Sequence, residues 1–163
     1  TPPIRVLPEL SEVGGLRRVL EDGTLEVLPG MAPEELQVRF PGLALDLSEV
    51  PSEGWWSQGV PEDKTDTGRR AIRDRVARVA KWLRELRPSA PGPRHVIIIG
   101  HGALLSRLLG ELLGAPPGSC AFSHGNTAVT HIELRAHSVH VHCVNWMPSS
   151  RQSSDAMSAT ASS

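Results

Sequence analysis

The fold is decided by His95-Val96-Ile97-Ile98-Ile99-Gly100-His101-Gly102, followed at once by Ala103-Leu104-Leu105-Ser106-Arg107-Leu108-Leu109-Gly110-Glu111-Leu112-Leu113. The run 95–99 is apolar and β-branched, which is typical of a buried parallel strand. The run 103–113 has helical spacing and ends at Gly114, a residue type that favours helix termination. A strand that passes directly into a helix places the residue between them at the carboxyl edge of a sheet, where ligands bind. We therefore expect His101 at such an edge.

The surroundings of His101 favour an anionic ligand. Gly100 and Gly102 carry no side chain that would keep a ligand away from the backbone. The helix that follows begins with N–H groups that lack helical partners and attract anions. The pattern indicates a phosphate site. The nucleophile turn of α/β-hydrolases, G-x-S-x-G, is the rival interpretation, but Gly102 stands at its serine position and Ser106 comes a full turn later.

Composition bounds the function classes. The chain has 163 residues and a net charge of -1, which predicts one domain and argues against a dedicated nucleic-acid binder. No apolar run reaches the length of a membrane span, so we expect no membrane partner. Two cysteines, Cys120 and Cys143, make no disulfide framework, and the reducing cytoplasm is the expected compartment.

A metal site is weighed for the histidines near the end of the chain. His131 and Glu133 share one face of a predicted strand, and His140 and His142 share a face of the next. No cysteine or acidic cluster completes a ligand set, so neither metal nor cofactor is expected.

The rest of the chain predicts an α/β domain. We expect a strand at 4–7, an irregular excursion over 16–31, a helix over 33–40 and a loop over 43–61 that contains Trp55-Trp56. Apolar residues at helical spacing predict a long helix over 63–86. Alternating residues predict a hairpin from 127–134 and 139–144. The expected organisation is one domain over 1–147 and a disordered serine-rich tail over 148–163.

Several segments in this order resemble the histidine phosphatase, or phosphoglycerate mutase-like, superfamily. Val96-Ile97-Ile98-Ile99-Gly100-His101-Gly102 resembles the motif of its second histidine, and Leu10-Ser11-Glu12-Val13-Gly14-Gly15 resembles the segment of its acid. Leu28-Pro29-Gly30-Met31, Phe40-Pro41-Gly42, Gly54-Trp55-Trp56 and Glu62 resemble a eukaryotic branch, and Asn126-Thr127 and Asn145 resemble the closing hairpin. The resemblance covers roughly residues 4–147 and implies a three-layer α/β/α sandwich with a mixed, mainly parallel sheet.

The resemblance also implies a chemistry. Members move or hydrolyse phosphate on small phosphorylated substrates through a phosphohistidine. On this basis His101 is the second histidine, which binds phosphate oxygens, and Glu12 is the acid, which protonates the leaving oxygen. Gly102 supplies a backbone N–H. Taken alone, Glu12 and Glu62 would each be read as solvated charges, and the arginines of 63–86 as a solvated helix face. Glu62 and either Arg73 or Arg75 are further candidates for orientation or phosphate contact.

One part of the family pattern is missing. The nucleophile lies in an R-H-G motif after a first, central strand, and Arg-His-Gly occurs nowhere in these residues. Phosphoryl transfer needs an in-line attacker, so we expect the chain as given to be inactive or nearly so. The favoured explanation is a fragment, or a gene model that begins too late. The alternatives are a non-catalytic pseudo-phosphatase that binds a phosphorylated ligand or partner, and a partner or neighbouring segment that supplies the strand.

Overall fold

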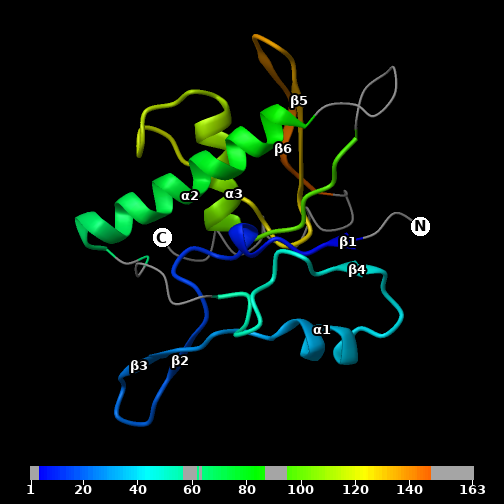
Figure 1. Ribbon diagram of the computed structural model, residues 1–163. Coiled ribbons are helices and arrows are strands. Elements are labelled where there is room, and N and C mark those ends of the chain that lie inside the picture. Colours follow the sequence, from blue (N-terminus) through cyan, green and yellow to red (C-terminus); the bar gives the residue numbers. More distant parts are fainter. Residues whose placement is uncertain (1–3, 57–61, 63, 87–94, 148–163) are drawn as a thin grey trace, which may run out of the picture. The chain divides into compact units, whose positions relative to one another are not determined.

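The computed structural model describes residues 4–56, 62, 64–86 and 95–147. These residues form a mixed α/β structure with three helices and three small sheets (Figure 1). The chain divides into two compact units, 1–104 and 105–163, and each is described by itself. The predicted tail, 148–163, lies outside the described residues, so the division into a domain over 1–147 and a tail stays a prediction.

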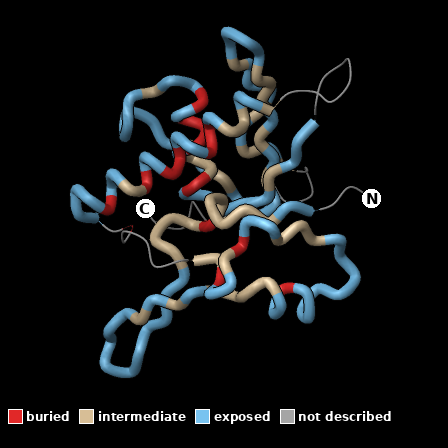
Figure 2. Tube along the Cα trace, in the orientation of Figure 1, coloured by how far each residue is buried: buried red, intermediate tan, exposed pale blue. Residues whose placement is uncertain are grey.

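The long helix α2 (Asp66–Glu85) is the main buried element of the first unit. Thr65 begins it, because its side-chain oxygen accepts a hydrogen bond from the N–H of Gly68 at 3.1 Å. Its buried face consists of Gly68, Ile72, Arg75, Val76, Val79 and Ala80, which recur at helical spacing (Figure 2). The predicted long helix is therefore confirmed with slightly shorter bounds, and a charged residue, Arg75, lies on its buried face.

The stretch predicted to be irregular contains a β-hairpin. Strands β2 (Arg17–Val19) and β3 (Leu25–Val27) pair antiparallel. The turn between them is closed by Asp22, whose carboxylate accepts from both the backbone and the hydroxyl of Thr24. The expectation of irregular structure over 16–31 was wrong because mixed polar and apolar residues hide the alternation of a hairpin that is exposed on both faces.

Short elements frame the rest of this unit. Strand β1 (Ile4–Arg5), within the predicted strand 4–7, pairs in parallel with β4 (Leu45–Asp46), in a region predicted to be loop. In the sequence, the 3₁₀ helix η1 (Pro8–Leu10) and helix α1 (Pro33–Arg39) come between these two strands. Helix α1 confirms the predicted helix at 33–40. Because β1 and β4 have two residues each, periodicity had too few positions to reveal β4.

The predicted strand at 95–99 is not a strand in the structure. Residues 95–101 have no secondary structure, and no described residue pairs with their backbone. Ile97 and Ile99 are each 90% exposed. A β-branched run favours extended backbone, but a strand also needs neighbours that pair with it, and the described residues supply none. The expected mainly parallel sheet is likewise not seen, since the parallel pairing described joins only β1 and β4.

Helix α3 (Gly102–Leu112) begins directly after His101, one residue before its predicted start. It buries Leu104, Leu108, Leu109 and Leu112, and Leu104 is fully buried. The second unit also contains the expected hairpin, formed by β5 (Val129–Leu134) and β6 (Val139–Trp146) with a bulge near His131. Among the described residues, every helix is too short or too polar to cross a membrane.

The cap of α2 gives a test of this fold. Thr65→Ala removes the acceptor for Gly68 and should lower the free energy of unfolding by about 1 kcal/mol. Thr65→Ser keeps a hydroxyl and is the matched control. Urea denaturation followed by circular dichroism measures both. Equal losses for Ala and Ser would contradict the capping role.

Candidate functional site

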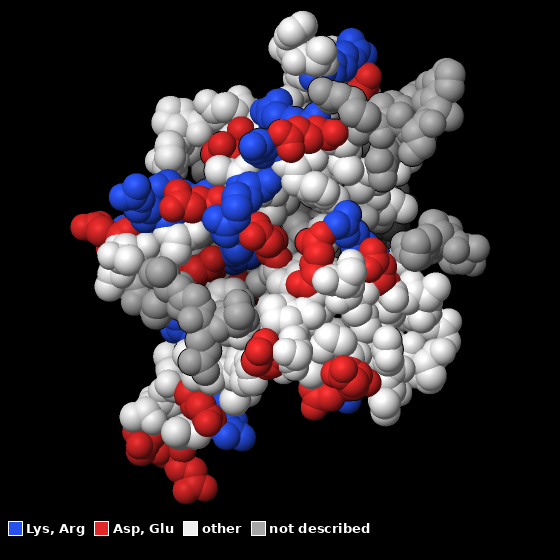
Figure 3. All heavy atoms as spheres, viewed as in Figure 1, with Lys and Arg blue, Asp and Glu red and all other residues white. Residues whose placement is uncertain are grey.

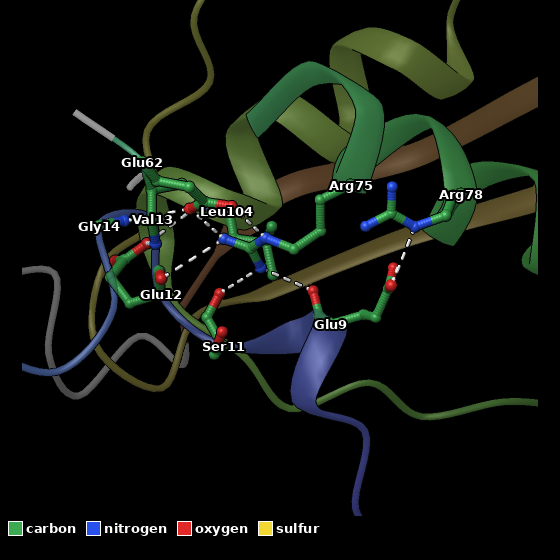
Figure 4. A network of polar contacts seen from close by, with 9 residues as sticks. All are labelled: Glu9, Ser11, Glu12, Val13, Gly14, Glu62, Arg75, Arg78 and Leu104. Atoms are coloured by element: carbon green, nitrogen blue, oxygen red, sulfur yellow. Dashed lines mark hydrogen bonds and ion pairs between the residues drawn. The ribbon is translucent and has the colours of Figure 1, made fainter. Parts of the chain in front are cut away.

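A buried ion pair between Arg75 and Glu62 lies at the centre of the predicted site residues (Figure 4). The guanidinium donates through Nε to Oε1 and through Nη2 to Oε2, each at 2.6 Å. The two side chains are only 7% and 5% exposed. Two parallel N–H···O bonds in a water-poor environment make this a strong, directional interaction.

The same guanidinium holds the chain segment that carries Glu12. Nη1 donates to the carbonyl oxygens of Glu9 at 2.7 Å and Ser11 at 2.9 Å, and Nη2 reaches the carbonyl of Glu12 at 3.5 Å. In return, the N–H of Gly14 donates to Glu62 Oε2 at 3.2 Å. Both members of the ion pair therefore bind the backbone around Glu12.

The carboxylate of Glu12 lies at the beginning of α3. Its Oε1 accepts from the N–H of Val13 at 2.7 Å and from the N–H of Leu104 at 3.2 Å. Leu104 is in the first turn of α3, where N–H groups have no helical acceptor. His101 is exposed and directly precedes this turn. The structure thus brings the segments of Glu12 and His101 together, although they are far apart in the sequence.

The remaining predicted residues differ in their surroundings. Gly102 is the first residue of α3 and is exposed. Arg73 is exposed on α2 and forms no ion pair with a described residue, whereas several neighbouring charges on α2 are paired with acids (Figure 3). Ser11 has a buried hydroxyl without a hydrogen-bond partner among the described residues. Buried hydroxyl groups normally have a hydrogen-bond partner, so the Ser11 hydroxyl is an unused polar group beside Glu12.

The tryptophan pair has a structural role that the sequence did not reveal. Trp56 lies on Gly15, where an added Cβ would come within 2.1 Å of the indole, and its ring is 6.0 Å from the guanidinium carbon of Arg75. Trp55 lies on Gly30 in the same way and packs edge-on against Trp56. Both glycines have positive φ. Two glycines of the family-like motifs, Gly15 and Gly30, therefore leave room for indole rings.

A second polar cluster lies on the β5–β6 hairpin. The rings of His131 and His142 stack with centroids 4.4 Å apart, and His142 Nε2 is 3.6 Å from Glu133. Arg135 hydrogen-bonds to Glu133, and this bond lowers the pKa of the Glu133 carboxyl. Among the described residues, no group of three or more His, Cys, Asp or Glu side chains is arranged to hold a metal ion.

Sequence reasoning missed the contacts made by backbone groups. The carbonyls of Glu9 and Ser11 and the N–H of Leu104 have no side-chain signature. The one available signal was Arg75 itself, which occupies an apolar position in the helical pattern Ile72, Val76, Val79. An arginine on a buried face requires a partner, and this one indicates a buried acid.

Comparison with known proteins identifies the family. The family model described as histidine phosphatase superfamily (branch 1) matches residues 38–147, a span of 110 of the 163 residues. The match includes Glu62, Arg75 and His101 but begins after Glu12. No curated protein and no solved structure gives a significant match. The chain belongs to the histidine phosphatase superfamily, whose general chemistry is phosphoryl transfer.

The packing of Trp56 against Gly15 can be tested by comparing alanine substitutions at two glycines. Gly15→Ala adds a Cβ against the indole at a φ of +70°, whereas Gly23→Ala adds one at +81° with no atom within 4 Å. The control should lose about 1 kcal/mol of stability from backbone strain alone. Gly15→Ala should lose about 2 kcal/mol more, because the indole must move. Similar losses of unfolding free energy for both variants, measured by urea denaturation, would show that the packing of Trp56 does not require a glycine at position 15.

The hairpin gives a pH prediction. The pKa of Glu133 lies below 4.5, chiefly because Arg135 hydrogen-bonds to its carboxylate. The stabilisation is therefore present above pH 4.5 and is lost as the pH falls through the lowered pKa. Arg135→Ala should return the pKa towards 4.5, and His142→Ala should have a smaller effect. NMR titration of the Glu133 carboxyl carbon measures this. A larger change in His142→Ala would contradict the assigned cause.

Proposed function

We propose that the chain contributes the second-histidine and acid part of a phosphoryl-transfer site that binds the phosphate of a small phosphorylated substrate. The observation that carries this proposal is the Glu12–Leu104 hydrogen bond, which holds a carboxylate at the helix N-terminus that follows His101. An imidazole, a helix N-terminus and a carboxyl group are the components needed to bind a phosphate and protonate a leaving oxygen.

In this proposal each residue has a stated role. His101 and the N–H of Gly102 bind the equatorial phosphate oxygens, where charge spreads in the transition state. A nucleophilic histidine attacks phosphorus, an N–P bond forms, and the P–O bond to the leaving group breaks. In its protonated form, Glu12 gives a proton to the leaving oxygen, and water later hydrolyses the phosphohistidine. Arg73 is the candidate for a further phosphate contact, because it is exposed and has no acidic partner among the described residues.

These 163 residues contain no Arg-His-Gly, and we infer that the nucleophile lies outside them. We propose that a further strand supplies it. Such a strand would pair with the backbone of 95–99, for which the described residues supply no partner. With it, 95–99 would join a mainly parallel sheet in a three-layer α/β/α sandwich. The exposed Cys120 and the free Cys143 are compatible with a place in the reducing cytoplasm.

The second candidate function is a pseudo-phosphatase that binds a phosphorylated ligand or partner without turnover. It is favoured by the absence of Arg-His-Gly together with the presence of His101 and Glu12. Both candidates predict that this chain binds phosphate. They differ in turnover once the missing strand is supplied.

Phosphate binding tests the proposal. Calorimetric titration of the chain with inorganic phosphate should show binding that His101→Ala weakens by about tenfold or more, because a charge-assisted hydrogen bond is lost. His137→Ala, an exposed histidine of the hairpin turn, is the control and should leave the affinity unchanged. Binding that is absent, or equal in the two variants, would reject the site.

A Glu12 variant and an activity assay provide two further tests of the proposal. Glu12→Gln should strengthen phosphate binding by about fivefold, because a nearby like charge is removed. The chain as given should not hydrolyse p-nitrophenyl phosphate above background. Robust turnover that depends on His101 would show that the nucleophile lies within these residues.

A further inference from the structure

We propose that Arg75, paired with Glu62, is a positioning residue that sets the carboxylate of Glu12 at the first turn of α3. The inference rests on the proposed function, since it concerns the acid of that site. It assigns Arg75 to the support of the acid and not to phosphate contact.

The segment that carries Glu12 has little structure of its own. Residues 11–15 lie in neither a helix nor a strand. One backbone hydrogen bond closes a turn within them, from the N–H of Gly15 to the carbonyl of Glu12 at 3.2 Å. Within the turn, the N–H of Val13 binds the Glu12 carboxylate, but this local bond does not fix where the turn lies relative to α3, so contacts from outside the turn must do so.

The ion pair supplies these contacts on both sides of Glu12. On the side before it, Arg75 binds the carbonyls of Glu9 and Ser11. On the side after it, Glu62 accepts from the N–H of Gly14. Arg75 also reaches the carbonyl of Glu12 itself. Because the backbone is held at both flanks, the carboxylate can extend to Leu104 without loss of further backbone freedom.

The donors of Arg75 are fully used by these partners. A guanidinium has five N–H groups, and here one acceptor is present for each: two oxygens of Glu62 and the carbonyls of Glu9, Ser11 and Glu12. The side chain is 7% exposed. A phosphate could bind Arg75 only by displacing Glu62 or the backbone. The geometry therefore favours positioning.

Arginine is the one side chain suited to this task. Its planar fork reaches acceptors in several fixed directions at once, and it stays charged in a buried place. Lysine keeps the charge but has one nitrogen, so it cannot bind a carboxylate in parallel and three carbonyls together. Arg75→Lys is thus a specific test, because it preserves charge and removes the geometry.

Arg78 offers a matched control. It lies one turn further along α2 and binds the same segment, through the side chain of Glu9 at 2.9 Å (Figure 4). This ion pair is exposed, with 59% and 40% of the two side chains accessible. Arg78→Lys makes the same chemical change on the same helix without touching the backbone around Glu12.

Hydrogen exchange of the Leu104 amide is the first measurement. This N–H is at the helix N-terminus, and its acceptor is Glu12. Arg75→Lys should speed its exchange by about tenfold, and Arg78→Lys should change it by less than about twofold. If Arg75→Lys shows no cooperative urea transition, Glu62→Gln replaces it, with the same direction expected. Equal exchange in the Arg75 or Glu62 variant and in the Arg78 variant overturns the proposal.

A double-mutant cycle is the second measurement. Glu12→Gln should strengthen phosphate binding by about fivefold in the wild-type and Arg78→Lys backgrounds. In the Arg75→Lys background the same substitution should change the affinity by less than about twofold, because Glu12 is no longer held at the site. A purely structural role for Arg75 would leave the Glu12 effect intact, and that result overturns the proposal.

The two measurements separate failure of the inference from failure of the proposed function. If the wild-type chain does not bind phosphate but Leu104 exchange responds to Arg75 and not to Arg78, the proposed function is wrong and the positioning role stands. If phosphate binding depends on His101 but neither Leu104 exchange nor the Glu12 effect responds to Arg75, the function stands and the positioning role is wrong.

Discussion

The buried ion pair of Arg75 and Glu62 is the interaction on which the candidate site depends. Taking two charges out of water is expensive, and the attraction between them compensates only when the geometry is good and the remaining donors are bonded. Both conditions are met, because every N–H of the guanidinium has an acceptor. Removal of one partner from such a pair typically costs about 3–5 kcal/mol, since it leaves an uncompensated buried charge.

The ion pair links the turn after η1 to Glu62 and α2, which are neighbours in the sequence and come much later in the chain. Trp56 adds a further link, because its ring lies on Gly15 and near Arg75. This arrangement gives structural roles to glycines, tryptophans and an acid of the family-like motifs. Gly15 and Gly30 leave room for indole rings, and Glu62 supplies the counter-charge for a buried arginine. Gly15, Gly30 and Glu62 can therefore support the site without contact with a substrate.

The anion at the N-terminus of α3 is supplied by the protein itself. Glu12 occupies the N–H of Leu104, at the helix end where the sequence indicates a phosphate. A carboxylate and a phosphate compete for the same kind of donor, so a phosphate bound to this N–H would displace Glu12 from it. The exposed run 95–99 leads directly to this place, and no described residue pairs with its backbone.

The sequence by itself determined the family, the α/β class and the elements whose pattern is local. These are the two longer helices, α1 and the closing hairpin, because periodicity and caps act within one segment. The sequence also singled out Glu12, Glu62, Arg75 and His101. Only the tertiary structure decided their contacts. It paired Arg75 with Glu62 and brought Glu12 to Leu104, and among the described residues it gave 95–99 no strand partner. The physical reason is that backbone carbonyls, N–H groups and strand partners carry no side-chain signature, and they meet only when distant segments fold together.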